Sequence, residues 1–487
     1  MIRAERRRIE RTLRSYKSIP TNERLTASSG IGVLVEIFYK SPLFNEMMKH
    51  LPERLSHRSL GAGPLALTLI AGHLLGVESV EDLEEIRDDE FLMELFGDDV
   101  PAPRTLLDYL NDFEESHIDG LNQFLNIMSR TLHQMVIAEH PEVLGTDRIV
   151  DIDSTYHKHY GDLIEGVTWN YKNEWSLESQ VAFNSLGFCH HLWVRPGNTK
   201  SGTDADLMIN KIYSVEIPQL ERKRAGRDYV RMDSAFCNQD TIKACMGRGL
   251  LFTITANKAT TFWHDLMNEE GIDWKDWEYS EKELKAFTRQ GMEPTKVQLG
   301  RIWWKPKWAD DTLLFPIIIK RTWKSFCKYR EKNKNVDSLF DVAGIAESGG
   351  WDYYAVVTNM DVTQWNYQEI MQHHQKRGST ENMNKAAKYG YSLNNLPCRK
   401  LVANRAWYIF AMLAHNLMRF VAIMDNPEQP SMAKKTRRKF INFPAKIAER
   451  SKQLWLRVPV KYFKGVIELI EGWCFPEQVR THIHSTA

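Results

Sequence analysis

The chain has 487 residues, of which 43% are apolar and 26% charged, and its formal net charge is +1. This is the composition of a globular protein; the length predicts two to four domains or a core with a large insertion, and the charge indicates no uniformly acidic or basic partner. The six cysteines form no C-x-x-C pair, which argues against a zinc ribbon or a disulfide framework. The longest apolar run, residues 64–77, is too short to span a bilayer. We therefore expect an untargeted cytoplasmic protein with no membrane partner.

Residues 1–145 are predicted to form a helical N-terminal region that binds DNA or mediates dimerisation. Most of residues 28–140 follow helical patterns. Four arginines near the N-terminus have spacings that place them on one helix face: Arg3, Arg7, Arg11 and Arg14. Such a face is either a solvated basic helix or a contact with a phosphate backbone.

Residues 146–258 predict an α/β unit. Three strand-like segments come first, followed by a helix, a strand, a helix ended by glycine and a further strand. They cover residues 148–155, 176–185, 186–198, 204–222, 229–236, 238–249 and 250–258. This is the element order of a ribonuclease-H-like core with a mixed sheet, and the segment is predicted to be its first part.

The rest of the chain is predicted to interrupt and then complete this core. Residues 259–350 cluster tryptophan, lysine and proline around a few strand-like pieces, which indicates a β-rich insertion. Residues 351–425 resume the core with a strand, a long helical stretch and an apolar helix at residues 353–360, 363–388 and 401–424. Residues 426–487 form a basic C-terminal region, which is either a solvated tail or a contact with a DNA backbone.

Carboxylates stand at two predicted strand ends. Asp151 and Asp153 are two residues apart on the first strand, so they point to the same face, and either could be a metal ligand. Asp233 ends the fourth strand, where an aspartate is often only a turn or N-cap residue. In a ribonuclease-H-like core these two strands are neighbours, and a third carboxylate from a later helix would complete an oxygen-ligand site for two Mg²⁺ ions.

Glu381 is the candidate for that third carboxylate. On one continuous helix, His374, Arg377, Glu381 and Lys388 fall within an arc of about 60°, although Gly378 could bend the helix between them. One acid would then share a face with three groups that suit phosphate. The alternative is an exposed helix face with an ordinary ion pair between Arg377 and Glu381.

The same residues carry a resemblance to a known family. Arg377, Glu381 and Lys388, with three and six residues between them, resemble the Tyr-Arg-Glu-Lys signature of bacterial insertion-sequence DDE transposases, a branch that includes the insertion sequence four superfamily; the tyrosine position is His374. Further segments resemble the insertion sequence thirteen-eighty group, in the same order: "VESVEDLEEIRDDEFLMELFG", "PAPRTLLDYLNDF", "DIDST", "RPGNTKSG", "VRMDSAF", "RGSTEN" and "NLPCRKLVANRAWYIFAMLAHNL". The resemblance spans about residues 28–425.

The resemblance implies a metal-dependent enzyme that binds terminal inverted repeats, cleaves the DNA strands and transfers them to target DNA in cut-and-paste transposition. Asp153, Asp233 and Glu381 match the catalytic, metal-binding acids, with Asp151 in reserve, and two Mg²⁺ ions are implied, with Mn²⁺ tolerated. The implied assembly is a homodimer that holds two DNA ends in a synaptic complex at the bacterial nucleoid.

The resemblance also implies DNA contacts. Arg377 and Lys388 match the residues that hold DNA phosphates. His374, in place of the tyrosine, can still donate a hydrogen bond to a phosphate, and protonation would strengthen it. The insertion is expected to supply an aromatic ring that stacks on a flipped base. Trp323 is the first choice among four tryptophans, each of which could instead be buried: Trp303, Trp304, Trp308 and Trp323.

Two other functions stay open at this point. A decayed or domesticated transposase that only binds DNA would fit the same fold, and the histidine at position 374 is a departure that such a copy could carry. A structure-selective nuclease of the same fold is the other, because one fold supports many chemistries. The presence of all three acids favours the enzyme over the first of these, and the spacing of Arg377, Glu381 and Lys388 favours the transposase over the second.

Overall fold

The computed structural model describes residues 5–7, 9–11, 18–54, 60–96, 100–141, 148–159, 163–214, 227–269, 271–324, 350–450, 453–467 and 470. The predicted positions Arg3 and Arg14 lie outside these ranges, as does the second half of the helix expected at residues 204–222. Arg7 and Arg11 are exposed in short helical segments.

A ten-stranded sheet of mixed orientation forms the centre of the molecule. The path of the sheet is β3-β4-β2-β6-β7-β11-β10-β9-β8, and β5 also pairs with β4. The strands are β2 (Arg148–Lys158), β3 (Thr168–Trp169), β4 (Trp175–Asn184), β5 (Cys189–Pro196), β6 (Asp228–Met232), β7 (Leu251–Thr255), β8 (Lys275–Asp276), β9 (Val297–Trp304), β10 (Phe315–Lys324) and β11 (Gly350–Thr358). β2, β6 and β7 are parallel, whereas β4 and β5 are antiparallel to their neighbours. The predicted mixed α/β sheet is therefore present, with an order compatible with a ribonuclease-H-like core.

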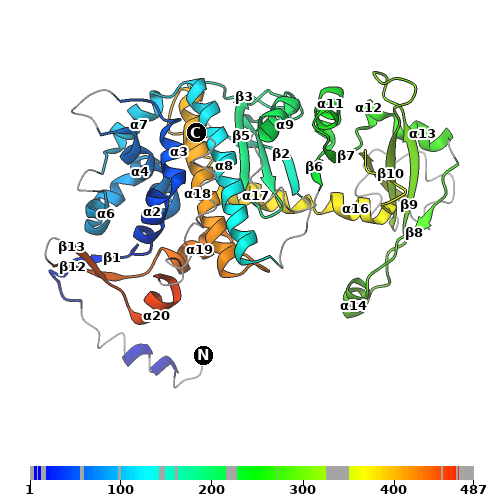
Figure 1. Ribbon diagram of the computed structural model, residues 1–487. Helices are drawn as coiled ribbons and strands as arrows, with labels where there is room; N and C mark the ends of the chain where they lie inside the picture. The colour runs from blue at the N-terminus through cyan, green and yellow to red at the C-terminus, as the bar shows by residue number, and fades with distance from the viewer. Residues whose placement is uncertain are drawn as a thin grey trace.

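The described strands of the predicted insertion continue this sheet. β11 pairs antiparallel with β7 on one side and with β10 on the other. β9 and β8 then follow β10, so they extend the sheet outward to the end seen on the right of Figure 1. The other elements of this segment are α12 (Lys258–Thr261), α13 (Trp263–Glu269) and α14 (Glu281–Arg289).

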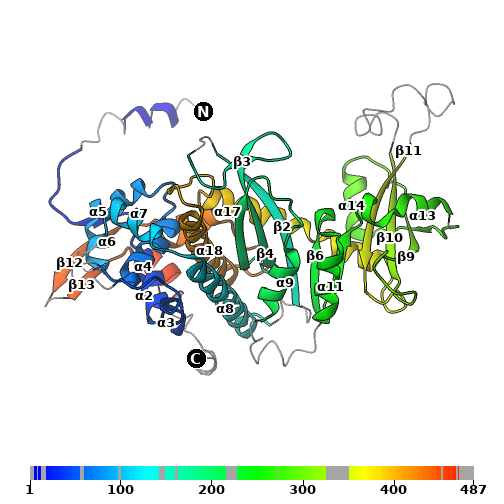
Figure 2. The same ribbon diagram turned by 90° about the horizontal axis from the view of Figure 1, so that it is seen from above.

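Helices cover both faces of the sheet (Figures 1 and 2). Val150 and Ile152 of β2 pack with α9 (Ala205–Ser214) and α11 (Gln239–Gly247) in one apolar cluster. Side chains of β4 on the opposite face pack with α8 (Glu115–Glu139) and α18 (Leu401–Asp425). Further along that face, α16 (Tyr367–Gln375) covers β10 and β11, and α17 (Gly378–Gly390) follows it beside β2.

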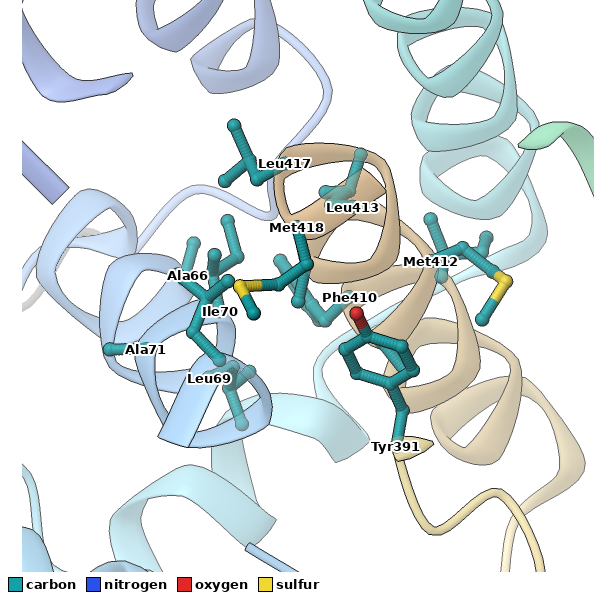
Figure 3. Packing of buried hydrophobic residues seen from close by; sticks show 14 of the residues in the cluster. Ala66, Leu69, Ile70, Ala71, Tyr391, Phe410, Met412, Leu413, Leu417 and Met418 are labelled. Atoms are coloured by element: carbon teal, nitrogen blue, oxygen red, sulfur yellow. The ribbon is translucent and has the colours of Figure 1, made fainter. Parts of the chain in front are cut away.

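α18 is the core helix that its apolar sequence predicts. It packs between α8 and α4 (Ala62–Leu75), and Figure 3 shows Met418 directed toward Ile70 of α4 while Met412 points to the other side. Within the described part of the chain, α18 is the one helix long and apolar enough to cross a membrane, and 94% of its most apolar window is buried inside the protein. Burial against other helices therefore accounts for its apolar composition.

The N-terminal and C-terminal regions share one body. The helices that surround α4 are α2 (Ile31–Lys40), α3 (Pro42–Met48), α5 (Glu84–Asp88), α6 (Glu90–Leu95) and α7 (Pro103–Asn111). β1 (Leu25–Thr26) pairs with β12 (Ala445–Arg450), which pairs with β13 (Gln453–Arg457) in a small separate sheet. The chain that leaves α18 thus returns to the helical region at the left of Figure 1.

Part of the basic C-terminal run has a structural role. In α19 (Ala433–Phe440), Arg437 donates to the carbonyl oxygens of Leu74 and His73 at the end of α4, at 2.6 and 3.1 Å, and to that of Gly390 at 3.0 Å. α4 ends in Gly76 at φ 92°, a conformation that favours glycine, and the guanidinium covers it. Arg437 therefore stabilises a helix end, while Lys434, Lys435 and Arg438 remain exposed.

Candidate active site

The sheet brings Asp153 and Asp233 side by side. β2 and β6 are parallel with Ile152 opposite Met232, so the next residue of each strand is one of the two aspartates. Asp233 lies where β6 ends, and its Oδ1 accepts a hydrogen bond from the Ala235 backbone N–H at 2.9 Å. The predicted N-cap role of Asp233 is therefore present, and its carboxylate also faces its neighbour across the strand pair.

The two carboxyl groups share a buried electrostatic environment. Burial raises the pKa of Asp153 to about 6, the Arg377 guanidinium opposes this rise, and the charges of Asp233 and Glu381 add to it. Burial also raises the pKa of Asp233, against the Ala235 hydrogen bond and Arg377. Asp153 is buried and Asp233 half-buried. A bound cation would relieve the repulsion between the two like charges, and raised carboxyl pKa values are typical of functional sites.

Asp151 is not available as a ligand in this structure. It is 1% exposed, and its two carboxylate oxygens accept hydrogen bonds from Arg231 Nε and Nη2 at 2.5 and 2.8 Å. Arg231 Nη1 also donates to the His373 carbonyl oxygen at 2.8 Å. Asp151 does share the strand face of Asp153, as predicted, but it anchors α16 through Arg231, and this geometry removes it as an alternative to Asp153.

The continuous helix expected at residues 363–388 is two helices. α16 ends at Gln375, and α17 begins at Gly378 with Arg377 as its N-cap residue. The break places His374 and Glu381 on different helices, so the arc calculated for one straight helix does not describe their side chains. Arg377 lies at the junction, where it faces Asp153.

His374 lies in the interior. It is 1% exposed, with Nδ1 at 3.0 Å from Thr253 Oγ1 and Nε2 at 3.0 Å from Thr255 Oγ1 and 2.9 Å from the Tyr354 hydroxyl. Burial, with Arg377 and Arg231 nearby, lowers the pKa of His374 to about 3, so the ring is neutral at physiological pH. A neutral ring with both nitrogens engaged ties α16 to β7 and β11, and this geometry does not support the predicted phosphate contact.

Arg377, Glu381 and Asn384 surround Asp153 from the helix side. Arg377 Nη1 lies 3.6 Å from Asp153 Oδ1, and Asn384 Nδ2 donates to Asp153 Oδ2 at 2.9 Å. Glu381 is exposed in the first turn of α17, close enough for its charge to raise the pKa of Asp153. Asn384 was not predicted, although its position three residues after Glu381, on the same helix face, is a signal that the sequence carries.

Lys388 is held against β2. Its ammonium donates to the Tyr156 carbonyl oxygen at 2.8 Å, and the side chain is half-buried. Burial and then Lys158 lower the pKa of Lys388. Because an ammonium has three protons, Lys388 keeps donors for a further acceptor such as a phosphate.

The four tryptophans named from the sequence differ in exposure. Trp304 is 5% exposed and belongs to the core, whereas Trp303 is 38% exposed with the Arg301 guanidinium over its ring at 4.7 Å. Trp308 and Trp323 are half-buried, and Trp323 packs edge-to-face on Trp351 at 5.2 Å. The alternative that a tryptophan is buried in the core therefore holds for Trp304. Trp303 offers more exposed ring surface for stacking than Trp323.

The donor set suits a hard divalent cation. Asp153 and Asp233 present carboxylate oxygens, which Mg²⁺ and Mn²⁺ prefer over nitrogen and sulfur. Among the described residues, no group of three or more His, Cys, Asp and Glu side chains lies close enough to form a metal cluster. The two aspartates, with Arg377 3.6 Å from Asp153, fit one side of a divalent-cation site. Glu381 stands in the first turn of α17.

The raised pKa of Asp153 predicts a pH-dependent stability of the metal-free protein. The folded state holds the proton more tightly than the unfolded state, whose pKa is about 3.8, so the free energy of unfolding falls as the pH rises to about 6. Two pH units correspond to about 3 kcal/mol at most. In urea unfolding, Asp153→Asn should be more stable than the wild type at pH 7.5 and no more stable at pH 4. The exposed Asp240→Asn is the control, and a difference that is equal at both pH values would contradict the assignment.

The chain matches the family described as transposase DDE domain group 1 over residues 20–305 and 344–467. These two segments cover more than half of the chain and include Asp153, Asp233 and Glu381. The gap between them falls within the predicted insertion. No curated protein matches the chain.

Proposed function

Because the chain belongs to the transposase DDE domain group 1 family, we propose that it binds the terminal inverted repeats of a mobile element, cleaves the element's ends and joins them to target DNA. We place it in the insertion sequence four superfamily, in its thirteen-eighty group, on a ribonuclease-H-like core. The observation that carries the proposal is the pair Asp153 and Asp233 at neighbouring positions of the parallel strands β2 and β6, with the Arg377 guanidinium 3.6 Å from Asp153.

The proposed catalytic residues are Asp153, Asp233 and Glu381, which would hold two Mg²⁺ ions, or Mn²⁺ in their place. When bound, these ions activate the attacking water or 3′-hydroxyl and stabilise the leaving oxygen. Asn384 holds the Asp153 carboxylate in one orientation through its 2.9 Å hydrogen bond. The turn after β6 holds Asp233 in the same way through the Ala235 N–H.

Arg377 is proposed to hold the DNA phosphate next to the acids. Its guanidinium lies at the α16–α17 junction, where Arg231 and His374 fix the preceding helix to the sheet. A guanidinium offers two parallel N–H donors to a phosphate. The 3.6 Å separation from Asp153 Oδ1 leaves Arg377 free to turn toward a phosphate without breaking a short bond. Lys388 is proposed as a second phosphate contact on the same helix.

The other proposed DNA contacts lie away from the acids. In the insertion, Trp303 joins Trp323 as a candidate for base stacking because it is more exposed. The exposed lysines of α19 and the N-terminal arginines would follow the backbone of a DNA end. Two ends must be held together for cut-and-paste transposition, so we propose a homodimeric synaptic complex in the bacterial cytoplasm, at the nucleoid.

The test is cleavage of DNA that carries the element's own ends. Purified protein with MgCl₂ or MnCl₂ and a fragment that spans the coding sequence and its flanks should give breaks at the inverted repeats, and chelation of the metal should abolish them. Binding of the repeats without cleavage in either metal would instead establish a transposase-derived DNA-binding protein. Cleavage set by DNA structure and independent of the repeats would indicate a nuclease.

A further inference from the structure

The hairpin of β3 and β4 presents an aromatic and basic surface beside the candidate active site. We define the hairpin surface as five residues: Lys158, Trp169, Tyr171, Lys172 and Lys388. Trp169 is 54% exposed and Tyr171 75% exposed, and the Lys172 ammonium lies 5.4 Å from the Tyr171 ring centre. Lys158 forms an ion pair with Glu174 at 2.5 Å, so three lysines and one glutamate meet here.

Both exposed rings are held in place from below. Trp169 packs on Trp175 at 5.1 Å, and Tyr171 packs edge-to-face on Tyr156 at 5.6 Å. The loop between the strands is closed by Asn170 Oδ1, which accepts hydrogen bonds from the backbone N–H groups of residues 172 and 174 at 2.8 and 3.1 Å. A ring that is already fixed loses little conformational entropy when a base stacks on it.

The hairpin surface continues the candidate active site along two parallel supports. The backbone of Tyr156 follows Asp153 by three residues on β2, a separation of about 10 Å. The Tyr156 ring lies on the opposite face of the sheet, whereas Trp169, which pairs with Trp175, lies on the face of Asp153. Lys388 follows Glu381 by seven residues on α17, which is again about 10 Å. α17 and β2 are joined at both ends of this interval, by the Asn384–Asp153 and Lys388–Tyr156 hydrogen bonds. One DNA strand advances about 3.4 Å per nucleotide in a duplex, so the interval corresponds to about three nucleotides.

We propose that the hairpin surface binds a single DNA strand about three nucleotides from the phosphate that is cut, with an unpaired base stacked on Trp169, a further base stacked on Tyr171 at the hairpin tip, and backbone phosphates on Lys172 and Lys388. The occupant is a nucleic acid strand because lysine charge and exposed ring faces are what phosphates and base faces require. The position of the strand relative to the cut rests on the proposed function, whereas the affinity of the surface does not. Figures 1 and 2 show β3 at the rim of the molecule, where it pairs with β4 at the edge of the sheet.

Binding is measured on the full chain in EDTA, where no cleavage occurs, by the fluorescence anisotropy of a labelled 12-nucleotide oligothymidylate. Trp169→Ala and Tyr171→Ala should each weaken binding about tenfold, within the range for loss of one base stack, and Tyr171→Phe should restore it. Lys172→Ala should reduce the salt dependence of binding by about one counterion. The control is Tyr39→Ala, a ring that is 56% exposed on α2 in the helical region.

An unchanged affinity in the Trp169→Ala, Tyr171→Ala double variant, with an unchanged urea midpoint, would overturn the proposal. The proposal would also be overturned if a heparin fragment of the same charge bound as tightly as the oligothymidylate and the aromatic variants did not change its affinity. That result would show a surface that binds polyanions without base stacking. Failure of the proposed function gives a different result. If the wild-type protein cleaves no DNA but the aromatic variants still bind oligothymidylate more weakly than it does, the hairpin surface is supported and the transposase activity is not.

The position of the strand is tested with 2-aminopurine placed singly at each of six positions on either side of the mapped cut. The base about three nucleotides from the cut should show a fluorescence change on binding that Trp169→Ala removes. A change confined to bases next to the cut, or insensitive to Trp169→Ala, would contradict the position.

Discussion

Asparagine in place of Asp233 is expected to reduce the rate of DNA cleavage by at least about 100- to 1,000-fold, the scale of losing one preorganised electrostatic group. The substitution removes one negative charge and one anionic oxygen from the pair with Asp153, so the site holds a divalent cation more weakly. Asparagine is as good an N-cap residue as aspartate, and its side-chain oxygen accepts the Ala235 N–H bond in the same way. The variant therefore separates loss of chemistry from loss of the turn.

The measurement is the single-turnover rate of strand cleavage, with affinity for the DNA ends measured in parallel. Affinity should stay within about threefold of the wild type, since neither variant nor wild type depends on Asp233 for phosphate contact. Asp240→Asn, an exposed acid on the following helix, is the matched control and should cleave normally. Cleavage by Asp233→Asn at more than a tenth of the wild-type rate would exclude Asp233 as a metal ligand.

The strands and two of the acids could be predicted because their signals are local. Alternation of apolar and polar residues marks β2, β4 and β5. Asp153 interrupts the apolar run of β2, which continues to Lys158, and Asp233 follows the last residue of β6. Their adjacency follows from the predicted order of strands, and the register of β2 with β6 agrees with it. The buried helix α18 was equally legible, because an apolar stretch of that length has to be covered.

The surroundings of the acids could not be predicted, because they depend on partners distant in sequence. His374 occupies the position of a signature tyrosine, but its environment is set by Thr253 and Thr255 of β7 and by Tyr354 of β11. Both strands pack against α16. The continuous helix was inferred from a helical period that runs through residues 376–378, and the period carries no information on a two-residue break. Strands β8 to β10 read as an insertion along the chain, whereas hydrogen bonding joins them to the main sheet.

Asparagine in place of Asp151 is expected to destabilise the protein by about 3–5 kcal/mol, the usual cost of removing one partner from a buried ion pair. Arg231 is 2% exposed as a residue, and without the carboxylate its charge would be left in the interior with neutral acceptors, such as the asparagine amide oxygen and the His373 carbonyl oxygen, in place of an anion. The same strand pair supplies a matched control. Arg148 and Asp228 join β2 to β6 with a similar two-bond geometry, at 2.7 and 2.9 Å, but about a fifth of each side chain is exposed. Asp228→Asn should therefore cost about 1 kcal/mol or less.

Urea unfolding at pH 7.5 measures both variants, and a second comparison separates charge from packing. Asp151→Leu combined with Arg231→Met removes both ions, so the double variant should be less destabilised than Asp151→Asn alone. Arg231 also fixes the end of α16, and Arg377 comes two residues after that end. Asp151→Asn should therefore reduce the rate of DNA cleavage as well, even under conditions where the protein remains folded. Equal losses of stability for Asp151→Asn and Asp228→Asn would mean that water reaches Arg231. In that case the Asp151–Arg231 pair would not orient the α16–α17 junction toward the acids.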